Sequence, residues 1–224
     1  MTEHLTRDLN KIKQHVLGMA GLAEEALGLA LAAFTIREEV PAQRLQEVEA
    51  RIDQLQLDID DEIIKCLALH QPVARDLRFV TSAMRIVNDL ERIGDLTTSI
   101  AARLLFLVHQ DPLGEPLEIA SMMRETAAML RDSLNAFVTF DSELARSVCE
   151  RDDIVDEQNR RHFELLVERM KRDPGSVERA VALLSISRCV ERIADMSTNI
   201  SEDVVYMVDA EDIRHPGHAE SEST

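Results

Sequence analysis

The sequence has few aromatic residues and few of the residues that interrupt helices. Its 224 residues include no tryptophan, one tyrosine and six phenylalanines, and only seven glycines and six prolines. The apolar residues make up 45% of the chain and are mostly aliphatic. Helix formers therefore outnumber turn residues, and no alternating strand pattern competes with them, which favours an all-α protein.

Cysteines and long apolar runs are also scarce. Cys66, Cys149 and Cys189 form no Cys-x-x-Cys pair, which argues against a closed zinc site and predicts buried free thiols in a reducing cytosol. The first residues are charged where a signal peptide needs an apolar run, and no apolar run reaches the roughly 18 residues of a membrane span. We therefore expect a cytoplasmic protein without direct membrane insertion.

Basic residues are outnumbered by acidic ones. The chain has 25 Lys and Arg against 42 Asp and Glu, a formal net charge of −17. Nucleic acids and anionic lipids require a basic patch, so we expect no nucleic-acid partner. Such a surface suits solubility alone, and it equally suits a protein that binds cations or a basic protein face.

Apolar residues recur at three- and four-residue spacing over long stretches, which is typical of amphipathic helices. Proline and glycine mark the breaks between these stretches. The resulting six predicted helices lie at 5–38, 41–69, 73–108, 116–148, 151–172 and 175–209. Their short connections predict antiparallel neighbours, and the polar segment 214–224 is predicted to be a disordered tail.

An internal repeat is the most informative feature. The segment Leu90–Asp95 (LERIGD) returns as Val190–Asp195 (VERIAD), 100 positions later. Upstream the offset is 103, so that Phe34 aligns with Phe137. The change of offset places a three-residue shortening between the second and third helices of the second copy. A duplicated three-helix unit explains both offsets.

We therefore predict an all-α fold of two tandem, sequence-related three-helix bundles with six long helices. The first bundle is expected at residues 1–110 and the second at 116–213.

Acidic pairs at a spacing of four residues occur at equivalent places in both copies. This spacing puts both carboxylates on one helix face, where like charges cost a few tenths of a kcal/mol. On a helical wheel, Glu91 and Asp95 lie at the border of the core-facing side, where an unpaired charge is expensive. The four pairs are Glu49/Asp53, Glu91/Asp95, Asp152/Asp156 and Glu191/Asp195.

Three kinds of partner for these carboxylates stay open: a cation, water, or arginine. The nearby arginines in the sequence are Arg51, Arg75, Arg78, Arg92 and Arg192. The sequence has no Glu-x-x-His pair and no His-Glu-x-x-His motif, so an all-carboxylate site would suit Mg, Ca or Mn best, with iron as a further candidate. His70 and His162 are isolated and are predicted to lie on the surface or in loops.

No phosphate-binding glycine loop and no nucleophile motif is present, so we expect no enzyme activity.

Two segments resemble the paired signatures of the PhoU family, namely Val87–Asp95 and Ser187–Asp195. The segment Thr198–Tyr206, with Glu211–His215 after it, resembles the C-terminal end of that family, and Val73–Arg78 also fits. The resemblance covers nearly the whole chain, and its motifs occur twice in register.

The resemblance implies bound metal ions, often iron or zinc and in multinuclear clusters. Mn, Mg, Fe and Zn are therefore all candidate cofactors. One departure is that Leu96 and Met196 stand where the family commonly has a histidine, so any contribution of that histidine is missing here. The metal ligands implied by the resemblance are Glu49, Asp53, Glu91, Asp95, Asp152, Asp156, Glu191 and Asp195.

The resemblance also implies a regulatory role. Members of the family look like adaptors between the ATPase subunit of a high-affinity phosphate ABC transporter and a sensor histidine kinase. They repress phosphate uptake and the phosphate-starvation response, and the resemblance implies a homodimer. Two alternatives stay open, a metal-free acidic helical scaffold and a hydrolase that uses metal held by carboxylates.

Overall fold

The computed structural model describes residues 3–113 and 118–214. Within these ranges the chain is all-helical, with seven α-helices, one 3₁₀ helix and no strand. The elements are α1 (Glu3–Ile36), α2 (Ala42–His70), α3 (Ala74–Val108), α4 (Ile119–Thr139), α5 (Ser142–Cys149), α6 (Asp152–Arg172), η1 (Pro174–Ser176) and α7 (Val177–Asp209).

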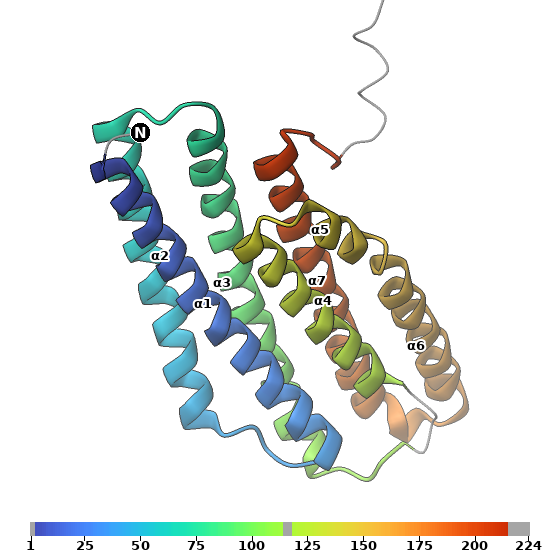
Figure 1. Cartoon of the computed structure of the whole chain (residues 1–224). Helices are drawn as coiled ribbons and strands as arrows, with labels where there is room; N and C mark the ends of the chain where they lie inside the picture. The colour runs from blue at the N-terminus through green and yellow to red at the C-terminus, as the bar shows by residue number, and fades with distance from the viewer. Residues whose placement is uncertain (1–2, 114–117, 215–224) are drawn as a thin grey trace, which may run out of the picture.

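The helices form two bundles of equivalent architecture that lie side by side (Figure 1). Helices α3 and α7 run antiparallel through the centre and pack closely on each other. Helices α1 and α4 cover this pair, while α2 flanks the first bundle and α6 flanks the second. The six long helices confirm the predicted all-α fold. The exact bundle boundaries stay a prediction, because one apolar core runs through both halves.

Between the second and third helices, the second copy has fewer non-helical residues than the first, because η1 leads directly into α7. In the first copy α2 ends where Gln71 takes a left-handed conformation with φ 46°. Three residues, 71–73, then lead into α3. In the second copy Asp173 alone separates α6 from η1, and its side chain accepts a hydrogen bond from the Gly175 N–H at 3.0 Å.

The predicted helix 116–148 is wrong. The chain turns at Phe140, which has a φ of 56°, and α5 begins beyond Asp141, whose carboxylate accepts from the Leu144 N–H at 2.9 Å. Arg37, the equivalent of Phe140 at an offset of 103, also has a φ of 56°. Helices α5 and α6 together therefore correspond to α2.

Helix α1 is long and apolar enough that length and composition alone would let it cross a membrane. Its residues Ile12, Val16 and Met19 are fully buried in the core. The helix packs against α2, α3 and α4. Burial within the bundle therefore explains part of this composition, and the absence of a membrane span stays a prediction.

One smaller prediction is corrected in part, and another stays a prediction. All three cysteines are free, but only Cys66 is fully buried, because Cys149 and Cys189 each keep some solvent exposure. Of the predicted tail 214–224, only Arg214 is described, and its guanidinium lies 5.9 Å from the centre of the Tyr206 ring. Residues 215–224 lie outside the described part of the chain.

Candidate metal centre

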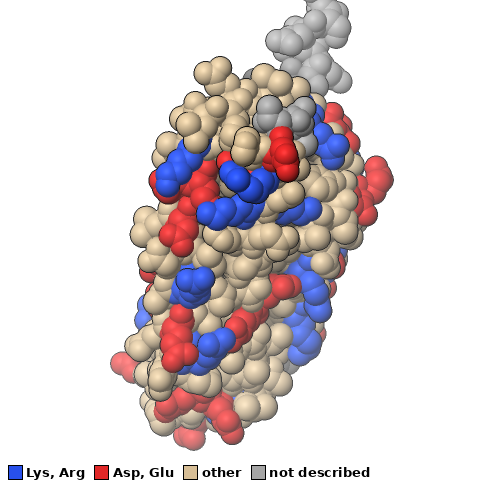
Figure 2. All heavy atoms as spheres, turned by 60° about the vertical axis from the view of Figure 1, so that its left-hand side comes forward, with Lys and Arg blue, Asp and Glu red and all other residues tan. Residues whose placement is uncertain are grey.

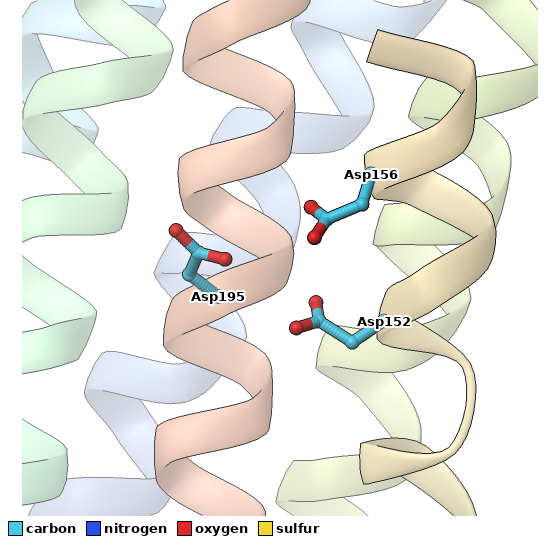
Figure 3. A group of neighbouring side chains, drawn as sticks. All are labelled: Asp152, Asp156 and Asp195. Atoms are coloured by element: carbon cyan, nitrogen blue, oxygen red, sulfur yellow. The ribbon is translucent and has the colours of Figure 1, made fainter. Parts of the chain in front are cut away.

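Three of the predicted carboxylates converge in the second bundle. Asp152 and Asp156 lie one turn apart on α6, and Asp195 faces them from α7 (Figure 3). One oxygen from each side chain lies within 4.8 Å of the corresponding oxygens of the other two. The sequence spacing therefore produces the expected meeting of the second and third helices of this bundle.

The start of α6 is held in place by Arg151. Its Nε donates to Glu125 at 2.7 Å and its Nη1 donates to Asp132 at 2.6 Å, and both acceptors belong to α4. This half-buried ion-pair network fixes the residue directly before Asp152. These ion pairs attach the start of α6 to α4 and so hold Asp152 in position within the cluster.

The cluster is electrostatically strained when it holds no cation. Burial, followed by the charge of Asp195, raises the pKa of Asp152 to about 6. Burial, followed by the charge of Glu191, raises the pKa of Asp195 to about 6. The pKa of Glu191 is also raised, by burial and by Asp156. These four carboxylates therefore repel one another. A positive charge placed among them would reduce the repulsion.

Unsatisfied polar atoms accompany the cluster. Asp152 Oδ1 and Thr198 Oγ1 are buried and complete no hydrogen bond, although Thr198 lies close enough to oppose the rise in the Asp152 pKa. Thr98, the equivalent of Thr198 in the first bundle, also has a buried hydroxyl without a partner. Thr98 and Thr198 belong to the sequence repeat, but they were not predicted as site residues.

The first bundle assembles its carboxylates less tightly. Burial raises the pKa of Glu91, and the charges of Asp95 and Asp53 raise it further, so these three groups share one region. Within the described residues, no group of three potential ligands in this bundle meets the spacing found in the second one. Among the positions equivalent to the cluster, only Glu49 differs in type, standing where the second bundle has Asp152.

Gly94 brings α3 close to α2 at the level of these carboxylates. A Cβ added at Gly94 would lie only 3.2 Å from Ile52 Cδ1, closer than most packed side chains allow. Ile52 precedes Asp53 in α2, and Gly94 precedes Asp95 in α3. The glycine thus permits the helix approach that places carboxylates from both helices in one region.

Arginine does not neutralise the predicted carboxylates. Within the described residues, none of the eight takes part in a salt bridge with a side chain. Arg92 and Arg192 lower the pKa of neighbouring acids through space only. Arg75 instead lies over the Phe140 ring, and Arg78 points to a backbone carbonyl of α7.

Elsewhere on the surface, charges of opposite sign pair. Figure 2 shows basic side chains set among acidic ones on the side that α1 and α2 help to form. One such pair joins Arg44 of α2 to Glu25 of α1 at 2.6 Å. The carboxylates of the cluster therefore differ from such surface acids, which form ion pairs with basic side chains.

The donor set fits a hard cation. Carboxylate oxygens are the ligands that Mg²⁺, Ca²⁺ and Mn²⁺ prefer, and iron also accepts them. The Thr198 hydroxyl, which lies beside Asp152, adds a further oxygen donor at the same place. The residues present are therefore suited to a metal ion.

No histidine in the part of the chain that the structure describes joins the cluster. The prediction that His162 lies on the surface is wrong, because this side chain is only 3% exposed. Its Nδ1 lies 3.0 Å from the Ser187 hydroxyl, and burial lowers its pKa. His70 is the last residue of α2 and lies 2.9 Å from an Asp8 oxygen, so it is also partly buried.

Comparison with known proteins gives consistent matches over nearly the whole chain. A family model described as the PhoU domain matches residues 16–104 and 119–204. The chain is 37% identical over 223 residues to a phosphate-specific transport system accessory protein PhoU homolog of Pseudomonas putida, covering 97% of this chain and 87% of that protein. A homolog of the same name from Aquifex aeolicus is 35% identical, covering 94% and 96%.

Solved structures agree with the sequence matches. The crystal structure of PhoU from Pseudomonas aeruginosa superposes with a TM-score of 0.88 at 33% identity, covering 92% of this chain and 99% of that one. The phosphate transport system regulatory protein PhoU from Streptococcus pneumoniae gives a TM-score of 0.85 at 30% identity, covering 93% and 99%. The duplicated sequence, the paired bundles and these matches together show that the chain belongs to the PhoU family.

Proposed function

We propose that this protein is an accessory protein of phosphate transport that represses phosphate uptake and the phosphate-starvation response. It would act as an adaptor, without catalysis, between the ATPase subunit of a phosphate ABC transporter and a sensor histidine kinase. Membership of the PhoU family supports this proposal, since relatives over nearly the full length are named as accessory proteins of a phosphate-specific transport system.

The carboxylate cluster is the observation that carries the proposed metal dependence. Asp152, Asp156 and Asp195 would hold a metal ion, with Glu191 supplying further negative charge beside them. The ion would neutralise the mutual repulsion of these groups and join α6 to α7. Glu49, Asp53, Glu91 and Asp95 would form a second and looser centre in the first bundle.

The test uses three variants and two readouts. Wild type is purified without chelator or nickel, and its metal content is measured by elemental mass spectrometry after incubation with Mn, Mg, Fe and Zn. We expect at least one bound metal ion per chain, lost in the variant Asp152→Asn/Asp156→Asn/Asp195→Asn. A first-bundle variant, Glu91→Gln/Asp95→Asn, should lose less metal, because its carboxylates are less tightly grouped.

The matched control is Glu157→Gln/Glu164→Gln/Glu168→Gln. It removes three exposed charges from the same helix α6, where these acids pair with Arg160 and Arg172. This control should keep the metal. A wild-type protein that stays free of all four metals would refute the proposed centre.

The second readout is a phosphate-starvation reporter in a strain that lacks the chromosomal gene. Wild type and the control variant should restore repression in phosphate-rich medium, and the cluster variant should not. A deletion strain that represses normally would refute the regulatory proposal itself. A cluster variant that is free of metal yet represses normally would separate regulation from metal binding.

A further inference from the structure

A cavity lies where the two halves of the molecule meet, at the end of α3 and the start of α7. Its volume is about 240 Å³, and we call it the arginine pocket. Its lining includes Leu104 and Leu107 near the end of α3 and Arg179 near the start of α7. Its main lining residues are Phe34, Arg37, Leu104, Leu107, Arg179 and Leu183.

The duplication supplies an internal comparison for this pocket. With the offsets of 103 and 100, Arg37 corresponds to Phe140, and Arg179 corresponds to Phe79. Phe140 and Phe79 border a groove at the opposite end of the molecule, beside the start of α3. The arginine pocket and this groove, which we call the aromatic groove, are therefore equivalent places in the two copies.

The two places differ in chemistry at the same backbone positions. In the aromatic groove the Phe79 ring stacks on Phe137 with centroids 6.0 Å apart, and it also packs on Phe140 at 6.4 Å. The arginine pocket keeps the counterpart of Phe137, namely Phe34, but replaces the other two rings by guanidinium groups. An aromatic cluster at one end thus becomes an apolar cavity with two cations at the other.

Backbone hydrogen bonds hold both guanidinium groups in place. Arg37 Nη2 donates to the carbonyls of Leu107 and Gln110 at 3.3 and 2.8 Å. Arg179 Nη1 donates to the Asp111 carbonyl at 3.0 Å, and its Nη2 donates to the Gly175 carbonyl at 3.3 Å. A guanidinium has five N–H donors, so each arginine keeps three N–H groups after these two hydrogen bonds.

The charge of the two arginines is not cancelled by a salt bridge within the described residues. Asp111 also borders the pocket, so the lining still has a net positive charge in a chain of net charge −17. The cations of the aromatic groove are more engaged, because Lys13 lies 4.4 Å and Arg75 lies 5.2 Å from the Phe140 ring centre. An anion is thus better matched by the arginine pocket.

We propose that the arginine pocket binds a small amphipathic anion, with an apolar tail and one carboxylate or phosphate head. The tail would contact the leucines and Phe34, and the head would accept hydrogen bonds from Arg37 and Arg179. The cavity volume of about 240 Å³ leaves room for an aliphatic tail of several carbon atoms. This site is independent of the carboxylate cluster.

The test is titration calorimetry of the full chain with octanoate and with octyl phosphate, which distinguish the two head groups, and with octanol as an uncharged probe. We expect saturable binding of at least one anion at one site per chain, and at least about tenfold weaker binding of octanol, because charge-assisted hydrogen bonds are lost. No saturable binding of either anion would overturn the proposal.

The variant Arg37→Phe/Arg179→Phe converts the pocket to the chemistry of its equivalent. Phe is compatible with this backbone, since Phe140 has the same φ of 56°. We expect binding to weaken at least about tenfold, with the helical circular-dichroism spectrum unchanged. If this variant does not fold, Arg179→Gln replaces it, and undiminished binding in the folded variant would overturn the proposal.

Lys13→Ala/Arg75→Ala is the matched control. It removes the same number of positive charges from the aromatic groove, so it tests whether net charge or that groove explains the binding. We expect the anion to bind this variant as it binds wild type. Loss of binding here, with binding kept in the arginine-pocket variant, would also overturn the proposal.

Discussion

A buried aspartate lies between α3 and α7, where its ionised form is disfavoured. Asp89 of α3 is only 8% exposed, and burial, followed by the charge of Asp203 on α7, raises its pKa to about 6. Asp203 has a direct partner, because Arg85 Nε donates to it at 2.7 Å. Asp89 makes no salt bridge of this kind within the described residues, and the charges of Arg92 and Arg85 offset its burial only in part.

Replacing this aspartate should change how stability depends on pH. The folded pKa of about 6 lies above the ordinary value of 3.8, so the folded state holds the proton more tightly. The contribution of Asp89 to the stability of the folded protein is then fully present below about pH 4. It is lost as the pH rises through about 6. We expect Asp89→Asn to raise the free energy of unfolding by about 2 kcal/mol at pH 8, with little effect at pH 4.

Urea unfolding at both pH values measures this effect. Asp60→Asn is the control, because Asp60 lies on α2, away from this interface, and should change stability by less than about 0.5 kcal/mol. Equal stability of Asp89→Asn and wild type at pH 8 would mean that Asp89 is not strained in the folded protein.

At the scale of the helices, the turn between α4 and α5 reverses the direction of the chain within the second bundle. Asp141 stabilises this turn by accepting from the Leu144 N–H at the start of α5. Loss of such a helix cap costs about 1 kcal/mol. We expect Asp141→Ala to lower the melting temperature by about 2–4 °C, as suits a chain of this size.

Thr139→Ala serves as the neighbouring control for this measurement. Its hydroxyl donates to the Asn135 carbonyl within α4 and caps no helix start. Thermal unfolding followed by circular dichroism should leave this variant close to wild type. An equal loss in both variants would show that the cap at Asp141 has no special role.

The same turn shows how far helices can be predicted from this sequence. Apolar periodicity located six long helices, because their buried faces are regular. It missed the turn at Phe140, since a phenylalanine in the left-handed conformation is rare and neither Gly nor Pro marks the place. The repeat contained the missing signal, because Arg37 ends the equivalent helix 103 residues earlier.

The sequence predicts which residues form the candidate site. It does not predict that they lie closer together in the second bundle than in the first. Spacing of four on two helices is enough to place Asp152, Asp156 and Asp195 near one another. The looser grouping in the first bundle, where Glu49 stands in place of Asp152, is not determined by sequence spacing. The burial of His162 likewise depends on contact with Ser187 of another helix.

For the molecule as a whole, the two bundles share one core. Helix α3 packs more extensively on α7 than on its own neighbour α2, and buried Ser82 donates to the Asp203 carbonyl across this interface at 3.2 Å. Separating the halves would expose both apolar surface and buried polar groups. The two sequence repeats are therefore not independent folding units.

We expect the full chain to unfold in one cooperative step. Urea transitions followed by circular dichroism and by the fluorescence of Tyr206, the single tyrosine, should coincide. The fragment 1–113 should lack a cooperative transition of its own, because it exposes the face of α3 that packs on α7. Two separate transitions, or a cooperatively folded fragment, would contradict this expectation.

Fusion of the two copies has a consequence for how the molecule can change over time. Two identical half-length chains paired as a symmetric dimer would display every substitution at both ends at once. In the single chain a substitution appears once, so one end could keep Phe79 and Phe140 while the other acquired Arg179 and Arg37. A single chain that carries both copies can therefore have different chemistry at its two ends while the paired bundles keep the same architecture.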